Sequence, residues 1–169
     1  MGVPTFIGAN GLPQPPVDAI FNLAIANTFT AIYAVGVALF ILVALWRTRN
    51  PNMVLAMIVG GALTTLNEPV FDILTVVWHP IINQNVAFTW LGRDIPVWAI
   101  LGYTAYYGCM GYLTTQALIK GVTVRSIWAW CLVPIAFDIL IEETMLHWDL
   151  YYYFANQPFV LIKFPLYQP

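Results

Sequence analysis

Two apolar segments of the chain carry carboxylates where a membrane-spanning helix would bury them. Five of the eight acidic residues fall there: Glu68, Asp72, Asp138, Glu142 and Glu143. An ionisable group at the centre of a span costs at least about 2.5–3.5 kcal/mol, so it is expected to face the interior of the bundle and to serve a purpose. Burial without a counter-charge raises the pKa of a carboxyl group. A carboxylic acid kept neutral in this way can act as a general acid.

These acidic positions recur at helical spacing. In the first segment one stripe of the helix carries Thr64, Glu68, Asp72, Thr75 and His79. In the second segment Asp138, Glu142 and Asp149 share a stripe, and Glu143 precedes His147 by four residues. Glu68 and Asp72 lie about 26 and 31 Å from the start of their helix, and Asp138 and Glu142 about 18 and 24 Å from the start of theirs. We therefore expect the two clusters to meet in the same half of the membrane.

The spacing suggests a division of roles. We expect Glu68 to protonate a carbonyl or hydroxyl oxygen, and Asp72 or Asp138 to take the proton from the attacking or eliminating centre. The remaining carboxylate and tyrosine faces would stabilise a cation-like centre, and Glu142 completes the catalytic set. The side chains expected to bind the substrate are Tyr107, Glu143, His147, Tyr152, Tyr153 and Asn156. The structural alternative is a buried Glu–Asp hydrogen bond that ties the two helices together.

A metal site is the competing chemistry for the same residues. Glu143 and His147, with Asp72 and His79, offer mixed oxygen and nitrogen ligands. The chain has only two histidines, and it contains neither an HExxH motif nor a pair of Glu-x-x-His motifs. We therefore predict no metal and no cofactor.

The composition defines the elements that must position these residues. Of the 169 residues 60% are hydrophobic, 15% are aromatic and 8% are charged. Soluble domains usually carry about 25% charged residues, so most of this surface must face lipid. The net charge of -2 and the scattered basic residues exclude a nucleic-acid partner.

Hydropathy predicts an all-α membrane bundle that forms a single transmembrane domain. Its four spans cover about residues 19–46, 51–79, 95–119 and 126–147. Pro69 and Pro134 would interrupt the two acidic helices, because each removes one backbone hydrogen bond. The apolar segment after residue 147 is expected to lie at the interface or to re-enter the membrane. Because this segment is apolar, we also expect it to lead into further membrane helices beyond the last residue or to contact further membrane subunits.

The basic residues predict the orientation. Arg47 and Arg49 follow the first span, and Lys120 and Arg125 flank the turn between the third and fourth spans. The positive-inside rule places these turns in the cytoplasm. We therefore expect an integral protein of the plasma membrane with its amino terminus outside, and we expect the carboxylates to lie in the outer half of the membrane.

Ordered short motifs between residues 50 and 167 resemble a known family. They are Asn67-Glu68-Pro69, Trp78-His79-Pro80, Gly92-Arg93-Asp94-Ile95-Pro96, Gly121-Val122-Thr123, Asp138 with Glu142, Tyr152-Tyr153 with Asn156-Gln157-Pro158, and Phe164-Pro165-Leu166. This arrangement resembles the AveC-like spirocyclase family of actinobacterial membrane proteins. The resemblance implies a polytopic protein that closes a spiroketal on a polyketide or dehydrates it. The chain departs from the family pattern at Phe154-Ala155, where members have a glycine, and at Tyr167-Gln168-Pro169, where members have a tryptophan-rich stretch.

Three functions are consistent with these features. The leading hypothesis is an acid/base cyclase or dehydratase that admits an apolar polyketide or isoprenoid lipid from the bilayer. The second is a non-catalytic, lipid-binding or scaffold subunit of a larger membrane complex. The third is an enzyme similar to membrane terpene cyclases or carotenoid hydratases, which also place acids on early and late helices. Proton-coupled transport would need polar residues in the cytoplasmic halves of the spans, and the sequence offers none there.

The leading hypothesis makes Glu68 indispensable. We predict that Glu68→Gln abolishes turnover while the protein still folds, because the amide preserves the shape of the side chain but cannot donate the catalytic proton. Turnover and folding of the variant are measured side by side. Retained activity would refute the role assigned to Glu68.

Overall fold

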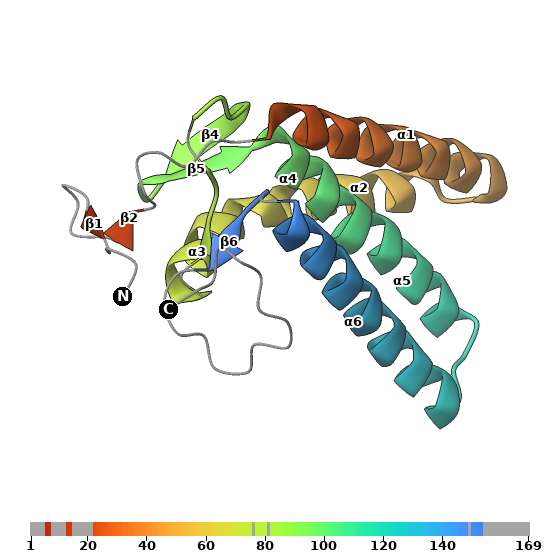
Figure 1. Ribbon diagram of the computed structural model, residues 1–169. Coiled ribbons are helices and arrows are strands. Elements are labelled where there is room, and N and C mark those ends of the chain that lie inside the picture. Colours follow the sequence, from red (N-terminus) through yellow and green to blue (C-terminus); the bar gives the residue numbers. More distant parts are fainter. Residues whose placement is uncertain are drawn as a thin grey trace. The chain divides into compact units, whose positions relative to one another are not determined.

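The computed structural model of the protein describes residues 6–7, 13–14, 22–75, 77–80, 82–148 and 150–153. The described chain is mostly helical (Figure 1). It divides into two compact units. The first unit contains Met1–Asn27, Leu66–Val97 and Glu142–Pro169, and the second contains Thr28–Thr65 and Trp98–Ile141. The predicted carboxy-terminal segment from residue 154 onward lies outside the described residues.

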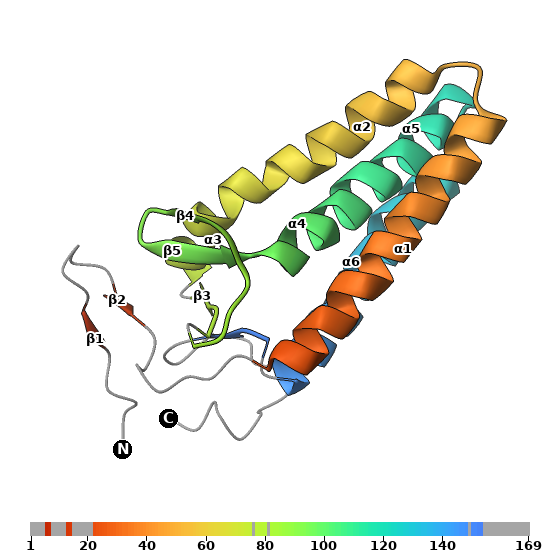
Figure 2. The same cartoon turned by 90° about the horizontal axis from the view of Figure 1, so that it is seen from above.

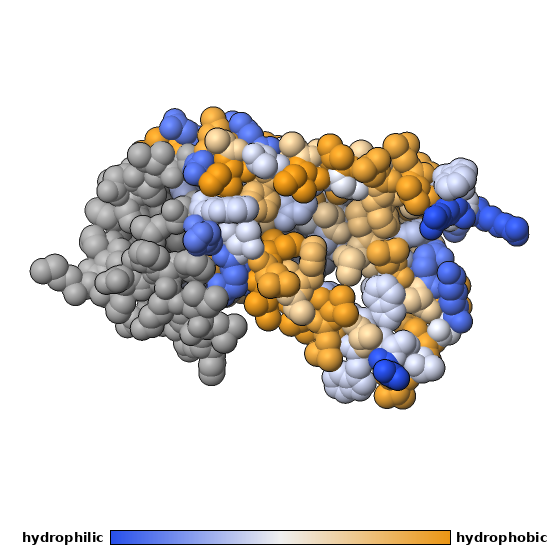
Figure 3. Space-filling model, turned by 45° about the vertical axis from the view of Figure 1, so that its right-hand side comes forward, coloured by the Kyte–Doolittle hydropathy of each residue, from blue (hydrophilic) through white to orange (hydrophobic). Residues whose placement is uncertain are grey.

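Three helices are long and apolar enough to cross a membrane. They cover Leu23–Arg47, Pro51–Thr75 and Val124–His147. The first is α1 and the third is α6, while the middle one is composed of α2 (Pro51–Thr64), η1 (Thr65–Asn67) and α3 (Glu68–Thr75). Hydrophobic residues cover much of the helical surface in Figure 3. The prediction of a mostly helical chain with apolar helices of membrane-spanning length is therefore confirmed.

The middle helix is interrupted where its proline predicts a break. Pro69 has no backbone N–H and cannot donate to the carbonyl of Thr65. The chain adopts a 3-10 turn over Thr65–Asn67, directly before this proline. The helix then ends at Thr75, and Val77–Trp78 forms strand β3 instead. The predicted helical end at residue 79 was therefore wrong, because β-branched and aromatic residues followed by Pro80 favour an extended chain there.

The apolar segment after residue 96 contains three pieces. They are α4 (Val97–Tyr103), a π-helical stretch η2 (Thr104–Met110) and α5 (Gly111–Ile119). Gly108 and Gly111, which lie in and directly after the π-helical stretch, have low helix propensity. The segment starts two residues later than the predicted start at residue 95, because Arg93–Pro96 is strand β5.

The first unit contains short strands that the all-α prediction did not include. β4 (Val86–Trp90) pairs antiparallel with β5, and β3 pairs antiparallel with β6 (Tyr152–Tyr153). A third ladder joins β1 (Phe6–Ile7) to β2 (Pro13–Gln14). Leu91 and Gly92 form the two-residue turn of the β4–β5 hairpin with φ angles of 52° and 72°. Positive φ at both positions is the geometry of a type I′ turn, which matches the twist of paired strands.

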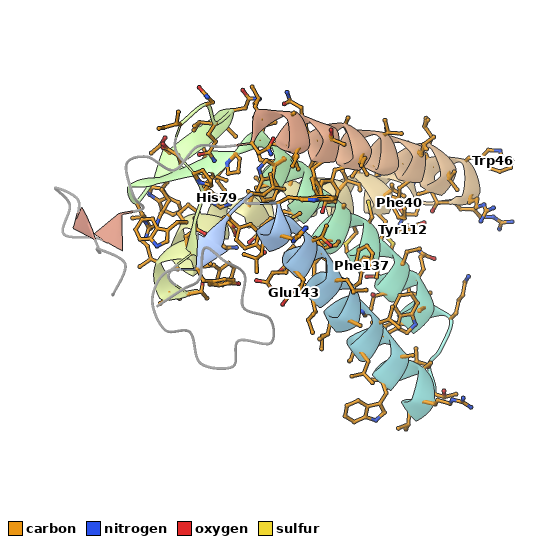
Figure 4. All side chains as sticks on the ribbon, viewed as in Figure 1. Phe40, Trp46, His79, Tyr112, Phe137 and Glu143 are labelled. Atoms are coloured by element: carbon orange, nitrogen blue, oxygen red, sulfur yellow. The ribbon has the colours of Figure 1, made fainter. Side chains whose placement is uncertain are left out.

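The second unit packs around closely spaced helices. α2 lies beside η2 and α5 (Figures 1 and 2). The rings of Phe40 and Tyr112 meet edge to face with centroids 5.8 Å apart (Figure 4), next to buried Ala44 and Val54. The tightest approach joins Gly61 to Gly108. A Cβ atom added at Gly61 would lie 2.6 Å from the Cα atom of Gly108, so only glycine fits there.

This contact yields a matched pair of substitutions. Gly61→Ala should lower the free energy of unfolding by about 1–3 kcal/mol, because the new methyl group meets backbone that cannot rotate away. Gly60→Ala is the control, since a Cβ atom at Gly60 meets nothing within 4 Å. Both changes raise helix propensity by about 1 kcal/mol, so their difference isolates packing. Unfolding in detergent micelles followed by circular dichroism measures both, and equal stabilities would refute the close contact.

Candidate functional site

The first unit brings together residues from three separate elements. Asp72 lies in the middle of α3 and is 2% exposed, and Trp78 lies in β3 and is 1% exposed. His79 follows β3, and Arg93 opens β5; both are buried. Because the helix ends at Thr75, the chain can place His79 close to Asp72 rather than two turns farther along the same helix. Figure 4 shows His79 at this end of β3.

Asp72 and His79 form a buried acid–imidazole pair. The Nδ1 atom of His79 lies 3.6 Å from Oδ2 of Asp72, and the two side chains are 3% and 2% exposed. This separation is longer than a hydrogen bond of about 2.7–3.2 Å. Within the part of the chain that the structure describes, Oδ2 of Asp72 accepts no hydrogen bond. Such pairs are often loose in a protein without substrate and tighten when the substrate binds.

Arg93 supplies a positive charge near this pair. Its guanidinium carbon lies 3.5 Å from the centroid of the Trp78 ring, which is a cation–π contact. Burial lowers the pKa of Arg93 below its ordinary value, and the negative charge of Asp72 acts in the opposite direction. The absence of basic residues from the spans had suggested that Asp72 would lie without a counter-charge. The hairpin provides that charge from outside the spans.

Aromatic side chains border His79 on a second side. The Tyr151 ring lies 5.9 Å from the His79 ring and 6.1 Å from the Tyr153 ring, measured between centroids. The Tyr153 hydroxyl donates a hydrogen bond to Oε1 of Glu142. The pairing of β3 with β6 positions these tyrosines, because Trp78 lies opposite Tyr152 in the ladder. Two predicted residues, Glu142 and Tyr153, are thus in direct contact.

Other predicted residues of the first unit surround this group less closely. Glu68 is half-buried in the first turn of α3. Glu143 is half-buried on α6 (Figure 4), and within the described residues its buried Oε2 atom accepts no hydrogen bond. His147 is exposed at the end of α6. Asp149, Asn156 and the side chain of Tyr152 lie outside the described residues.

The remaining predicted residues, Asp138 and Tyr107, belong to the second unit. Asp138 is exposed on α6 and lies within electrostatic reach of the Tyr33 and Tyr106 hydroxyl groups. The Tyr106 hydroxyl donates to the Pro134 carbonyl at 3.3 Å, and the ring of Tyr107 lies 5.0 Å from that of Tyr106. The structure thus groups Asp138 with tyrosines of its own unit, whereas Asp72 belongs to the first unit.

Sequence reasoning missed Arg93, Trp78 and Tyr151 as members of the site. Arg93 and Trp78 stood within the motifs Gly92-Arg93-Asp94 and Trp78-His79-Pro80, but no helical period connects these motifs. The available signal was the position of Arg93 in the sequence, far from the basic residues that flank the two helix–helix turns. Within the described residues no three His, Cys, Asp or Glu side chains are grouped so that they could hold a metal ion.

The chain matches no family model, no curated protein and no solved structure. What the site can do is therefore argued from its own residues. Asp72 can orient His79 through Nδ1, which leaves the other ring nitrogen of the imidazole to give or take a proton. The site combines proton transfer with aromatic surface that suits an apolar ligand.

The charge pairing makes a prediction about stability. Arg93→Met removes the cation–π contact with Trp78 and a positive charge that acts on buried Asp72, so it should lower the free energy of unfolding by about 1–3 kcal/mol. Adding Asp72→Asn to Arg93→Met should recover part of that loss. Unfolding of the single and double variants in detergent gives the coupling energy.

Asp94→Asn is the matched control in the same hairpin. The Asp94 carboxylate accepts a hydrogen bond of 2.6 Å from exposed Thr89, and surface contacts of this kind contribute about 1 kcal/mol or less. Equal losses for Arg93→Met and Asp94→Asn would contradict a buried charge pair at Asp72.

Proposed function

We propose that the protein is a membrane-embedded acid/base cyclase or dehydratase that acts on an apolar, oxygen-bearing lipid of the polyketide or isoprenoid class. The observation that carries the proposal is the buried pair of Asp72 and His79, 3.6 Å apart, beside the tyrosines of the β6 segment. Burying two ionisable side chains is unfavourable, and groups arranged in this way are frequent in sites of proton transfer. The apolar spans give a lipid substrate direct access from the bilayer.

The resemblance to the AveC-like spirocyclase family supports the same chemistry. The family-like motif Tyr152-Tyr153 and the acidic position Glu142, which are far from the motif Trp78-His79-Pro80 in sequence, all belong to the first unit. Tyr153 is hydrogen-bonded to Glu142, and β6 is paired with β3. Residues that carry the resemblance therefore contact one another, as members of a common site would.

The proposed reaction is closure of a spiroketal or a related loss of water. A ketone that carries two hydroxyl groups forms two C–O bonds at its carbonyl carbon, and the carbonyl oxygen leaves as water. The departing oxygen needs two protons, one at each bond-forming step, and Glu68 donates both in turn. His79, oriented by Asp72, takes one proton from each of the two attacking hydroxyl groups and returns it to Glu68, so two protons are removed and two are delivered over the cycle. The faces of Tyr151 and Tyr153 stabilise the oxocarbenium-like centre between the two bond-forming steps.

We also propose four spans, with α4, η2 and α5 together forming the third. These elements form a continuous helical stretch from Val97 to Ile119 whose length of about 34 Å is enough to cross the hydrocarbon core. The positive-inside rule then places the amino terminus and the Asp72 site on the outer side of the plasma membrane.

The experiment that tests the function compares the lipids of cells with and without the protein. Deletion should cause an apolar compound to accumulate that is heavier than the normal product by one water molecule, as measured by mass spectrometry of extracts. Equal masses would favour a terpene-type cyclisation, and a substrate lighter by one water molecule would favour a hydratase. If no apolar compound changes, the enzymatic proposal fails and a scaffold subunit explains the chain better.

A variant assigns the chemistry to the site. His79→Gln keeps the hydrogen-bonding shape of the side chain but cannot exchange a proton, so it should lower turnover about 100-fold or more. Asn52→Gln, exposed in the first turn of α2, is the control and should leave turnover within about twofold. The assay is complementation of the deletion strain with each variant, with protein levels matched by immunoblot. If His79→Gln converts the substrate as well as the wild-type protein does, His79 has no role in the mechanism.

A further inference from the structure

The basic side chains of the second unit lie at its two cytoplasmic turns. Arg47 ends α1 and Arg49 lies in the turn before α2, while Lys120 follows α5 and Arg125 lies in the first turn of α6. All four are exposed. Figures 1 and 2 both show these two turns at the same end of the unit, and Figure 3 shows hydrophilic residues gathered at one end of the helices. We name the four residues the basic end.

Within the second unit no acidic residue lies near this charge. The sequence of the second unit contains one acidic residue, Asp138. It lies about 20 Å along α6 from Val124, which exceeds the screening length of about 8–10 Å in physiological salt. Within the described residues no carboxylate forms an ion pair with any member of the basic end. The basic end therefore carries about four uncompensated positive charges.

Apolar and aromatic side chains flank these charges. Trp46 is 81% exposed beside Arg47, and Trp128 is 63% exposed one turn beyond Val124. Ile119 and Val124, on either side of the α5–α6 turn, are 68% and 74% exposed. Tryptophan in this setting is typical of the headgroup region of a bilayer. A soluble polyanion would cover the charges but would leave these apolar side chains in water.

Helix ends contribute little to the potential at the basic end. α2 begins at Pro51 and is capped by Asn50, whose side chain accepts a hydrogen bond of 3.2 Å from the backbone N–H of Met53. α6 begins at Val124, where Thr123 and Ser126 bond each other's backbone N–H groups. The positive ends of these two helix dipoles are offset by the negative ends of α1 and α5, which end at the same turns, so the positive potential comes from the side chains.

We propose that the basic end is a binding site for anionic phospholipid. The phosphate and glycerol headgroup of the lipid lie between the α1–α2 and α5–α6 turns, and the acyl chains lie along the exposed apolar residues beside them. Each basic residue near an anionic membrane surface contributes enough attraction to tighten binding about fivefold. A neutral phosphatidylcholine headgroup lacks the net charge and binds without this gain. The proposal does not depend on the enzymatic function.

Native mass spectrometry of the full chain tests the site. The protein in a mild non-ionic detergent receives equal amounts of dioleoyl phosphatidylglycerol and dioleoyl phosphatidylcholine, which share the same acyl chains. Bound phosphatidylglycerol should exceed bound phosphatidylcholine at least about tenfold. The preference should fall about fivefold with Arg49→Gln and disappear when all four basic residues are changed to Gln.

Controls separate charge from folding and from other anions. Arg47→Lys with Arg49→Lys keeps the charge and should keep the preference, and circular dichroism of every variant checks the helical content. Equal binding of the two lipids to the wild-type protein would overturn the proposal, as would a preference that survives the fourfold change. Soluble glycerol phosphate is added as a competitor, and displacement of the lipid at equal concentration would overturn it as well, because the site would then recognise the free anion.

Discussion

The first unit depends on the buried carboxyl group of Asp72, which lies 3.6 Å from His79 and within the electrostatic influence of Arg93. The residue that provides the charge comes from a strand rather than from a neighbouring span. Arg93 is itself buried and rests on the ring of Trp78, which in turn lies in the ladder with β6. One electrostatic requirement thus connects the end of a transmembrane helix, a hairpin and the segment that follows the last helix. Desolvation of both ions makes this arrangement sensitive to the loss of either partner.

The second unit depends on a different constraint, which is the distance between two backbones. Helices in lipid gain little from the hydrophobic effect and associate through close packing. Gly61 of α2 and Gly108 of η2 allow that approach. The π-helical stretch lies at this contact, and Tyr106 and Tyr107 extend from it. Packing within lipid and charge pairing in the first unit are therefore separate contributions to the stability of one chain.

Hydropathy predicted much of the helical part. The first span was expected over residues 19–46 and is found at Leu23–Arg47, and the last was expected over 126–147 and is found at Val124–His147. The interruption before Pro69 was expected from the missing N–H of proline, whereas the interruption expected at Pro134 was wrong, because α6 continues as one helix through that residue. These features depend on local chemistry, which a single sequence contains.

The site was only partly predictable because its contacts are not local. The spacing of Asp72 and His79 matches one face of a helix, but the helix ends at Thr75, between the two residues. Helical spacing alone therefore predicted the wrong position for His79. Arg93 reaches Trp78 through a hairpin, and no pattern in the sequence specifies that contact. The sequence also did not indicate that Asp138 and Asp72 belong to different compact units, because equal depth along two helices does not establish contact.

The pairing of β3 with β6 has a consequence for the order of assembly. Val77 pairs with Tyr153, and the hairpin, α4, η2, α5 and the whole of α6 lie between them in the chain. During synthesis the ladder cannot form until the last helix has been inserted and the residues after it have emerged. Contacts between such distant parts of a chain form late because they close a long loop. The surroundings of His79 are therefore completed after the membrane helices, so a nascent chain has its spans in place before it has its site.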